Sequence, residues 1–202
     1  MNDQELEIKY FIQDLPALEA RLKELGARLV QPRTRETNLR FDTPDGSLTS
    51  SYRVLRLRRD TEAKFTYKGP GRYEDGVRIR QEIEFTVGDF EAAQAFLKAL
   101  GYVVSVMYEK YRTSYELDRV EISLDELPYG TFAELEGPDT ESIRSLSDKL
   151  GLDWDARAEG SYIFLFSRLR ETRDLGFRDL SFENFRDLRV SPSDMDLKPA
   201  DA

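Results

Sequence analysis

The chain contains neither cysteine nor histidine among its 202 residues. Without cysteine, disulfides, thiolate zinc sites and cysteine nucleophiles are excluded. Without histidine, the usual general base and the usual transition-metal ligand are missing as well. Any metal ion must therefore be held by oxygen, which favours magnesium, manganese or calcium.

Long apolar runs are also missing. No segment approaches the roughly 18 apolar residues that a membrane helix needs, and the N-terminus lacks the basic and apolar regions of a secretion signal. We therefore predict a cytoplasmic protein without a membrane partner. The net charge of −9 argues against a protein that coats nucleic acid.

Charged residues make up 34% of the chain, above the usual share of about 25%. The length of 202 residues suits one substantial domain better than two. The extra charge must therefore have a place within a single fold, and its spacing along the chain indicates where.

Charged and apolar side chains alternate in eight segments. In "ELEIKY", residues 5–10, Glu5, Glu7 and Lys9 share one face and the apolar residues between them share the other. A period of two is typical of a β-strand whose faces differ. The other segments are residues 37–43, 53–60, 64–71, 76–85, 108–117, 119–127 and 131–137, and a Gly-Pro-Gly break is predicted at residues 69–71.

Amphipathic helices are predicted over residues 14–27, with Asp14 as N-cap, over 89–100 and over 139–150, and residues 161–169 form a further short helix. One strand of the alternating kind would turn its charged face to water. Eight in succession can bury their apolar faces under helices if the sheet closes with its charged faces inward. We predict an α+β fold over residues 1–169: a closed eight-stranded antiparallel β-barrel, or tunnel, with a charged interior and helices packed outside.

Residues 170–202 differ in character. "RDLGF" and "RDLSF" form a short near-repeat at residues 173–182, and the end is polar. The composition favours a polar, solvated tail with local order. A second interpretation is an interaction arm that docks on the neighbouring subunit of a homodimer through Phe177, Phe182 and Phe185.

The charges predicted to point inward form clusters of both signs. The basic residues are Lys9, Arg40, Arg56, Arg58, Lys64, Lys68, Arg78, Arg80, Lys110 and Arg112, and the acidic residues are Glu5, Glu7, Glu82, Glu84, Glu121, Asp125, Glu134 and Glu136. Like charges in a confined space repel one another unless a multivalent ligand occupies it. A polyphosphate with divalent cations is such a ligand, because Arg and Lys bind phosphate oxygens and paired carboxylates bind the cations. A self-compensating lattice of ion pairs is the alternative, and it leaves the acidic pairs without a purpose.

These segments resemble those of a known family. "ELEIK" is similar to the Glu-x-Glu-x-Lys signature of the CYTH superfamily, the triphosphate tunnel metalloenzymes. "FDTPDG", "LRLR", "TYKGP", "RQEIEF", "EKYR", "LDELPYGTFAELEG" and "SY" follow in the family's order, over about residues 3–167. The family includes class IV adenylyl cyclases, thiamine triphosphatases and inorganic tripolyphosphatases. The resemblance implies an eight-stranded tunnel, a triphosphate substrate and dependence on Mg²⁺ or Mn²⁺.

The resemblance also implies roles for individual residues. Lys9, at the reacting end, would be catalytic together with Glu5 and Glu7. The substrate would be bound by Arg56, Arg58, Lys68, Arg80 and Arg112. The metal ions would be bound or supported by Glu5, Glu7, Glu82, Glu84, Asp125, Glu134 and Glu136. Family members often use a basic residue on the C-terminal helix, for which this chain offers Arg168 or Arg170.

Three functions follow as hypotheses. The first is hydrolysis of inorganic tripolyphosphate or of a small organic triphosphate such as thiamine triphosphate. The second is conversion of ATP to cyclic AMP and pyrophosphate, because the sequence motifs are most similar to those of bacterial chains labelled class IV adenylyl cyclase. No residue set identifies an adenine pocket, however. The third is a non-catalytic module that binds polyphosphate.

Overall fold

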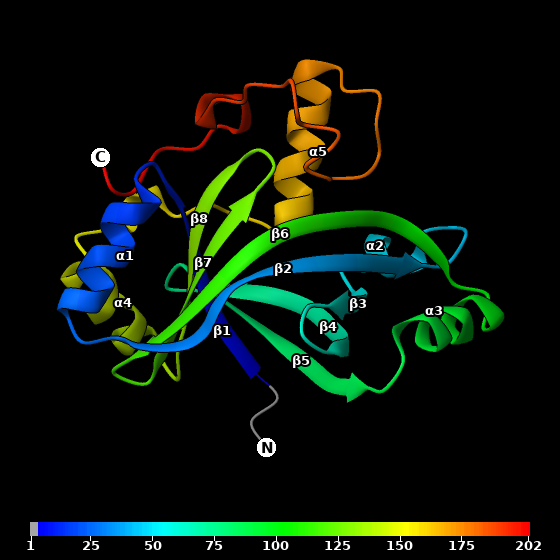
Figure 1. Ribbon diagram of the computed structural model, residues 1–202, viewed down its shortest axis with the longest axis horizontal. Coiled ribbons are helices and arrows are strands. Elements are labelled where there is room, and N and C mark those ends of the chain that lie inside the picture. Colours follow the sequence, from blue (N-terminus) through cyan, green and yellow to red (C-terminus); the bar gives the residue numbers. More distant parts are fainter. Residues whose placement is uncertain (1–3) are drawn as a thin grey trace.

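The alternating segments form eight antiparallel strands in the computed structural model, which describes residues 4–202 (Figure 1). The strands are β1 (Gln4–Ile12), β2 (Arg28–Asp42), β3 (Val54–Arg59), β4 (Ala63–Glu74), β5 (Val77–Val87), β6 (Val103–Leu117), β7 (Val120–Leu127) and β8 (Gly130–Glu136). They pair in the order β1-β5-β4-β3-β2-β6-β7-β8, and β8 pairs in turn with β1. The ring of hydrogen-bonded strands is therefore closed.

Five α-helices and two short 3₁₀ helices accompany the strands. They are α1 (Leu15–Glu24), α2 (Ser47–Ser50), α3 (Phe90–Ala99), α4 (Thr140–Lys149), α5 (Tyr162–Arg173), η1 (Trp154–Ala156) and η2 (Pro192–Met195). Asp14, Asp89 and Asp139 each accept a hydrogen bond from the backbone N–H three residues on, which satisfies a donor that the first turn leaves unpaired. The predicted N-cap at Asp14 is thus confirmed. In residues 4–202, none of the helices is both long and apolar enough to cross a membrane.

The apolar faces of the strands lie outside the ring, mostly under helices. Leu22 of α1 and Ile143 of α4 pack on the outer faces of β1, β7 and β8, and all of these apolar side chains are buried in one cluster. A second cluster lies between α3 and the outer faces of β2 and β3. Full burial of one such side chain stabilises the fold by about 1.5–3 kcal/mol. The sheet is thereby held with its charged faces inward.

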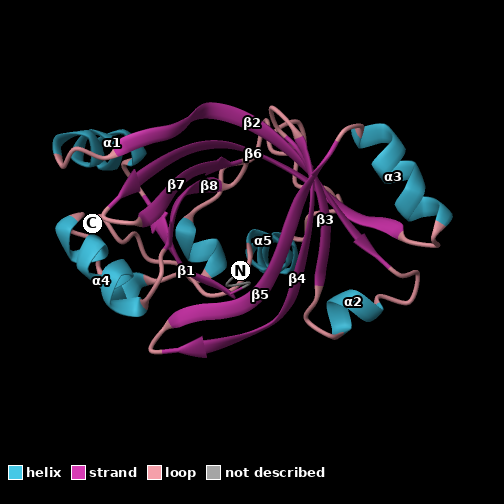
Figure 2. Ribbon diagram, turned by 90° about the horizontal axis from the view of Figure 1, so that it is seen from below, coloured by secondary structure: helices cyan, strands magenta, loops and turns pink. Residues whose placement is uncertain are grey.

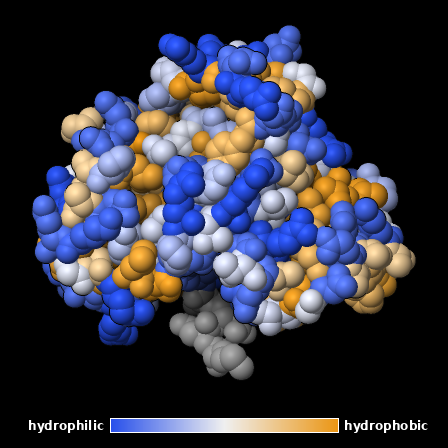
Figure 3. All heavy atoms as spheres, in the orientation of Figure 1, coloured by the Kyte–Doolittle hydropathy of each residue, from blue (hydrophilic) through white to orange (hydrophobic). Residues whose placement is uncertain are grey.

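The sequence-based prediction of helices packed outside had suggested that helices cover the whole outer surface of the ring. They leave part of that surface exposed. Phe85 on β5 is 56% exposed and Phe96 on α3 is 60% exposed. Apolar side chains are visible at the surface over α3 in Figure 3. The prediction is therefore correct for β1, β2, β3, β7 and β8, and wrong for part of β5.

The chain that follows β8 completes two strands of the ring. β1 pairs with β5 only from Gln4 to Glu7, and β6 pairs with β7 only from Tyr111 onward. Beyond those points, Ala158 N–H donates to the Lys9 carbonyl at 2.7 Å, and Ala200 N–H donates to the Phe11 carbonyl at 3.0 Å. On β6, Leu180 N–H donates to the Met107 carbonyl and Glu109 N–H donates to the Leu180 carbonyl, both at 2.9 Å. Backbone groups that β5 and β7 leave free are thus satisfied by the C-terminal chain.

Residues 170–202 are consequently not a solvated tail, and this prediction is wrong. Phe177 and Phe185 pack with Phe166 of α5, at ring-centroid distances of 6.0 and 5.9 Å, and Phe182 contacts Tyr111 at 5.3 Å. The three phenylalanines thus contact their own chain. The segment crosses α5 and ends beside α1 (Figure 1). Its buried apolar residues lie on irregular backbone, so they do not follow the period of a helix or a strand that a sequence pattern would reveal. A homodimer stays a prediction.

Two strand boundaries also differ from the predictions. β4 continues through Gly69-Pro70-Gly71 to Glu74, with a register shift between Lys68 and Gly71. A β-bulge accommodates the proline, which cannot donate to the ladder, so the predicted break is wrong. β2 begins at Arg28, well before the predicted start at residue 37.

Candidate active site

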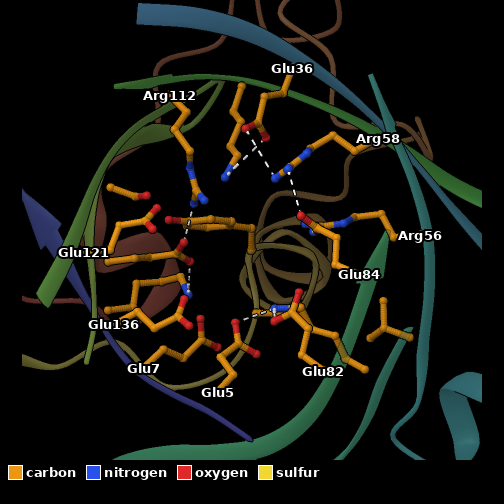
Figure 4. Close-up of a pocket in the computed structure, with 18 of the residues that line it drawn as sticks. Glu5, Glu7, Glu36, Arg56, Arg58, Glu82, Glu84, Arg112, Glu121 and Glu136 are labelled. Carbon is orange, nitrogen blue, oxygen red and sulfur yellow. Dashed lines mark hydrogen bonds and ion pairs between the residues drawn. The ribbon is translucent and has the colours of Figure 1, made fainter. Parts of the chain in front are cut away.

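The inward faces of the strands line a cavity of about 490 Å³ inside the ring (Figure 4). Ten basic and eight acidic side chains line it. Every charged residue predicted to point inward is among them except Asp125, and Glu36 is an addition that the sequence did not indicate. The central geometric prediction, one cavity that collects the charged faces, is confirmed.

Polarity changes in steps along the axis of the ring. On β1 the inward residues are Glu5, Glu7, Lys9 and Phe11 in succession. The register between β1 and β8 places Glu7 opposite Glu136, Lys9 opposite Glu134, and Phe11 opposite Phe132. The same axis therefore runs from a carboxylate layer, through a layer of ion pairs, to an apolar floor.

Helix α5 closes the floor. Tyr162, in its first turn, packs against Phe132 with ring centroids 5.2 Å apart, and Phe132 lies 5.4 Å from Phe11. Ser161, Tyr162 and Ile163 line the cavity itself. Figure 1 shows α5 at one end of the ring, and in Figure 2 the same helix is seen end-on behind the opening between the strands. The cavity is thus blocked at the α5 end.

Asp125 lies just above this floor and is fully buried. It accepts hydrogen bonds from Lys110 Nζ at 2.9 Å, from Arg112 Nε and Nη2 at 2.7 and 2.5 Å, and from the Tyr162 hydroxyl at 2.7 Å. With its oxygens occupied by these donors, Asp125 positions Lys110 and Arg112 and is not placed to bind a metal ion directly. Of the two roles that the resemblance implied, binding or supporting a metal ion, this geometry favours support.

Glu134 and Glu84 are also held by cations. Glu134 lies 2.7 Å from Lys9 Nζ and is bound by Arg112 as well. Glu84 accepts from the Thr66 hydroxyl at 2.8 Å and lies 3.3 Å from Arg58 Nη2. Both carboxylates therefore anchor the basic side chains around them.

The basic wall of the cavity is formed by Arg40, Arg56, Arg58 and Arg112, from β2, β3 and β6. Arg40 and Arg56 stand directly opposite each other on β2 and β3, which places two like charges side by side. In the described part of the chain, Arg40 forms no ion pair with a carboxylate, and burial lowers its pKa, as do Arg56 and Arg78. Arg56 Nε is buried without a hydrogen-bond partner among the described atoms. This wall has unused capacity for an anion.

Arg80 on β5 also has a lowered pKa and a buried nitrogen without a hydrogen-bond partner in the described chain. Burial and the adjacent Arg78 lower the pKa of Arg80 to about 10. Its guanidinium donates to the Gly69 carbonyl at 2.7 Å, while its Nε is buried with no partner among residues 4–202.

The acidic wall is formed by Glu5, Glu7, Glu121 and Glu136, from β1, β7 and β8 (Figure 4). Glu136 stands opposite Glu7 on one side and Glu121 on the other. Burial, followed by repulsion from Glu5, raises the pKa of Glu136 to about 8. Burial also raises the pKa of Glu5, one of whose oxygens has no hydrogen-bond partner among the described residues. Glu5 and Glu121 thus make Glu136 harder to ionise.

The donor set of the acidic wall fits a hard divalent cation, although its geometry is not that of a formed site. An orphaned carboxylate oxygen, like-charged neighbours on adjacent strands and the absence of nitrogen or sulfur ligands all match Mg²⁺ or Mn²⁺ chemistry. Among residues 4–202, no three acidic side chains already converge at metal-binding spacing. Side-chain rotation would be needed to bring them together.

Lys9 interacts with Glu134, in the layer of ion pairs, and with Glu7, in the acidic wall. Burial alone would lower its pKa, but the attraction of Glu134 and Glu7 outweighs burial and raises the pKa above its usual value. Lys68 is comparable: it lies 2.5 Å from Glu5 and 2.9 Å from Glu82. Both lysines are therefore firmly protonated cations in this arrangement.

Sequence reasoning missed two residues of the site. Glu36 is almost fully buried between Arg58, at 3.8 Å, and Lys110, at 3.6 Å, and their attraction lowers its pKa to about 2 in spite of burial. Its position two residues before Asn38 would have revealed it if the strand had been extended backwards. Tyr162 was noted only within the "SY" motif and in the predicted short helix, without a role in the site. Arg168 pairs with Asp196 instead, and neither it nor Arg170 lines the cavity, so the expected basic contact from the C-terminal helix is not made.

The protein is a closed antiparallel sheet around a cavity lined by charges of both signs. The model of the CYTH domain matches residues 3–150, and the chain belongs to the CYTH family. The resemblance noted from the motifs is thereby confirmed.

Named relatives agree with this assignment. A protein of Methanocaldococcus jannaschii, named "Putative adenylate cyclase", is 31% identical over 148 residues, which cover 72% of this chain and 81% of that protein. A structure from Vibrio parahaemolyticus, described as "a putative adenylate cyclase", has a TM-score of 0.74 at 23% identity and covers 83% of this chain and 99% of its own. A Hippeastrum structure, described as a "putative adenylyl cyclase" with "a dominant" triphosphatase activity, has a TM-score of 0.63 at 19% identity and covers 96% and 100%. At these identities the two structures show a shared fold.

Proposed function

We propose that the protein is a divalent-metal-dependent phosphohydrolase that cleaves a small triphosphate held in the cavity, either inorganic tripolyphosphate or an organic triphosphate. The observation that carries the proposal is the separation of charge into a basic wall with unpaired arginines and an acidic wall with crowded carboxylates. A polyanion relieves the repulsion on the first wall, and divalent cations relieve it on the second.

The basic wall, together with Arg80 and Lys68, would bind the phosphate oxygens. Arg40 and Arg80 are free of carboxylate partners in the described chain, and Arg56 has an unused Nε, so these three can accept a phosphate without breaking an ion pair. Arg58, Lys68 and Arg112 are tied to carboxylates and would exchange part of those contacts for phosphate. Guanidinium groups suit this role because they give two parallel hydrogen bonds to one phosphate.

The acidic wall would hold the metal ions. Glu5, Glu7 and Glu136 are the best-placed residues, with Glu82 and Glu121 beside them. Mg²⁺ or Mn²⁺, when bound, neutralises charge on the transferring phosphoryl group and orients the attacking oxygen. Glu84 and Glu134 would support the metal ions only indirectly, through the cations that they anchor.

Lys9 would act as a fixed positive charge toward the phosphate chain. A lysine whose pKa is raised is a poor proton acceptor near neutral pH, so a role as general base is disfavoured in this arrangement. Its ammonium group lies 2.7 Å from Glu134 and 4.4 Å from the centroid of the Tyr162 ring, which keeps it aimed into the cavity.

Adenylyl cyclase activity is the second candidate, because the relative from Methanocaldococcus jannaschii carries that name. The same phosphate and metal contacts would serve either reaction. The triphosphatase activity ascribed to the Hippeastrum protein is the reason for keeping hydrolysis first.

The test is a product analysis. The purified protein is incubated with tripolyphosphate, thiamine triphosphate and ATP in turn, with Mg²⁺ or Mn²⁺, and the products are separated by ion-exchange chromatography. Release of orthophosphate supports the hydrolase. Cyclic AMP with pyrophosphate would establish the cyclase instead, and binding of the substrates without any product would identify a polyphosphate-binding module.

A further inference from the structure

The basic wall of the cavity also carries a tyrosine. β3, β2 and β6 lie side by side in the ring, and Arg56, Arg40 and Tyr108 on these strands all line the cavity. Arg40 on β2 stands opposite Val106 on β6, and Tyr108 follows Val106 by two positions on the same face. Arg40 and Tyr108 are therefore diagonal neighbours on the inner face of the sheet.

The hydroxyl of Tyr108 has a proton without an acceptor. Arg56 Nη1 donates to this hydroxyl at 3.3 Å, so the tyrosine oxygen is the acceptor in that contact. An arginine offers no acceptor in return, and the proton of the hydroxyl must be donated elsewhere. Within residues 4–202 it is donated to no other group. Because Tyr108 is only 7% exposed and lines the cavity, an acceptor would have to come from inside the cavity.

The charges around the hydroxyl favour a negatively charged acceptor. Burial alone would raise the pKa of Tyr108, but Arg56 and Lys110 outweigh burial and lower it, so the surroundings favour negative charge at this point. Glu36 is the acidic residue that acts on Tyr108, and it is already held between Lys110 and Arg58. Arg56 Nε is a second donor here that has no acceptor in the described chain.

The C-terminal segment holds Tyr108 in place on β6. Leu180 N–H donates to the Met107 carbonyl and Glu109 N–H donates to the Leu180 carbonyl, both at 2.9 Å, so Leu180 pairs with the residues on either side of Tyr108. Tyr108 also belongs to the same buried apolar cluster as Leu180 and Tyr162. A side chain that is already fixed loses little conformational freedom when a ligand binds.

We propose that Tyr108 binds the substrate directly: its hydroxyl donates a hydrogen bond to an oxygen of the phosphate that Arg40 and Arg56 hold on the basic wall. The inference rests on the proposed function, because it needs a phosphate chain in the cavity. The phosphate supplies acceptors for the Tyr108 proton and for Arg56 Nε, which the described residues do not. Its negative charge also relieves the repulsion between Arg40 and Arg56, which stand opposite each other.

The test measures binding and stability separately. Dissociation constants for bis-methylene triphosphate, whose phosphorus atoms are joined through carbon, are determined by isothermal titration calorimetry with Mg²⁺. Melting temperatures are recorded for the same proteins without ligand. The variants are Tyr108→Phe, Arg40→Met and the two changes combined. Tyr10→Phe is the matched control, because the Tyr10 hydroxyl is also buried and lies 2.6 Å from Ser147 Oγ, but Tyr10 does not line the cavity.

Tyr108→Phe should weaken binding of the analogue by about ten-fold or more, as expected for the loss of a hydrogen bond to a charged group. Its melting temperature should stay close to that of the wild type, because the hydroxyl takes part in a single, long hydrogen bond within the described chain. Tyr10→Phe should show the reverse, a lower melting temperature and an unchanged affinity. In the Arg40→Met background, Tyr108→Phe should cost less affinity than it does alone, because two side chains that contact one phosphate do not act independently.

Equal affinities of Tyr108→Phe and the wild type overturn the inference. An equal loss of affinity in Tyr10→Phe does so too, because the loss of any buried hydroxyl would then disturb the cavity. If Tyr108→Phe lowers both affinity and melting temperature, the combined variant decides: additive losses overturn the inference, and non-additive losses support it. If the wild type does not bind the analogue, the proposed function fails and the inference fails with it. If the wild type binds and the hydroxyl adds nothing, only the inference is lost.

Discussion

Glu7 on β1 and Glu136 on β8 stand directly opposite each other in a hydrogen-bonded strand pair, with both carboxylates turned into the same cavity. Like charges in this position destabilise a sheet. Burial raises the pKa of Glu5, and burial with repulsion from Glu5 raises the pKa of Glu136, as expected for crowded carboxylates. The arrangement is understandable if the cost is removed by a bound cation.

We therefore expect Mg²⁺ or Mn²⁺ to raise the melting temperature, because a ligand that binds only the folded state stabilises it, by about 2.7 kcal/mol at one hundred times its dissociation constant. Glu7→Gln and Glu136→Gln should lose most of this shift, and Glu5→Gln or Glu7→Gln should abolish turnover. Glu91→Gln is the control, since Glu91 lies in an exposed pair with Arg59. Thermal scans with metal and with chelator make the measurement. Full activity in excess chelator would contradict the expectation.

The stability of the metal-free protein should fall as pH rises from about 5 to about 8. A carboxyl group whose pKa is about 8 when folded, against 4.5 as its ordinary value, holds its proton more tightly in the folded state. Its contribution is fully present below the ordinary pKa and is lost as pH rises through the folded pKa. Urea unfolding in chelator should show this decline, and Glu136→Gln should flatten it. An unchanged slope in that variant would assign the decline to other groups.

Lys9→Met should reduce the rate of hydrolysis without moving the midpoint of its pH profile. The chain has no histidine to titrate near neutrality, so ionisation of Glu136, whose pKa is about 8, should make hydrolysis increase from neutral to mildly alkaline pH. Since the pKa of Lys9 is raised, the rise should depend on a group other than this lysine. Rate profiles of both proteins at saturating metal provide the comparison. A rise that disappears in Lys9→Met would make the lysine the base.

Replacement of Arg40 and of Arg112 by methionine should affect the stability of the protein differently. Removing Arg112 leaves the buried Asp125 with fewer partners and should cost about 3–5 kcal/mol of unfolding free energy. Removing Arg40 breaks no ion pair within residues 4–202 and relieves its repulsion with Arg56, so stability should hold while triphosphate affinity falls. Urea titrations and calorimetry separate the two effects. Equal destabilisation by both changes would argue against an unpaired Arg40.

The C-terminal segment should contribute to the stability of the ring. Leu180 is fully buried where the segment pairs with β6, so Leu180→Ala should lower the unfolding free energy by about 2–5 kcal/mol. Leu188→Ala is a matched control from the same segment, because Leu188 is 38% exposed. A solvated tail would give no difference between the two variants.

The composition of the cavity could be predicted from the sequence because the face of a residue depends only on the period of two within its own strand. Glu5, Glu7 and Lys9 share a face wherever β1 lies in the sheet. Partners could not be predicted in the same way. Glu7 meets Arg78 and Glu136 because β1 lies between β5 and β8, an order that no local pattern contains.

The depth of a residue along the axis of the ring could not be predicted from the sequence either. Asp125 has the correct phase for the cavity, but the stagger of β7 against β6 places it beside Arg112, close to the apolar floor, where Tyr162 and two cations occupy its oxygens. Stagger is a property of the assembled ring. The role of residues 170–202 was missed for a related reason, since an irregular segment buries its apolar residues without any period.

The completion of β1 by Ala158 and Ala200 has a consequence for how the protein folds. β1 precedes all of its hydrogen-bonding partners in the chain, which are β5, β8, Ala158 and Ala200. A growing chain must therefore carry β1 incompletely paired until Ala200 has been added. Contacts between residues so distant in sequence slow folding, because the loops that join them must close first. Removing the segment that contains Ala200 would thus disturb the folding of β1, the strand that supplies Glu5, Glu7 and Lys9.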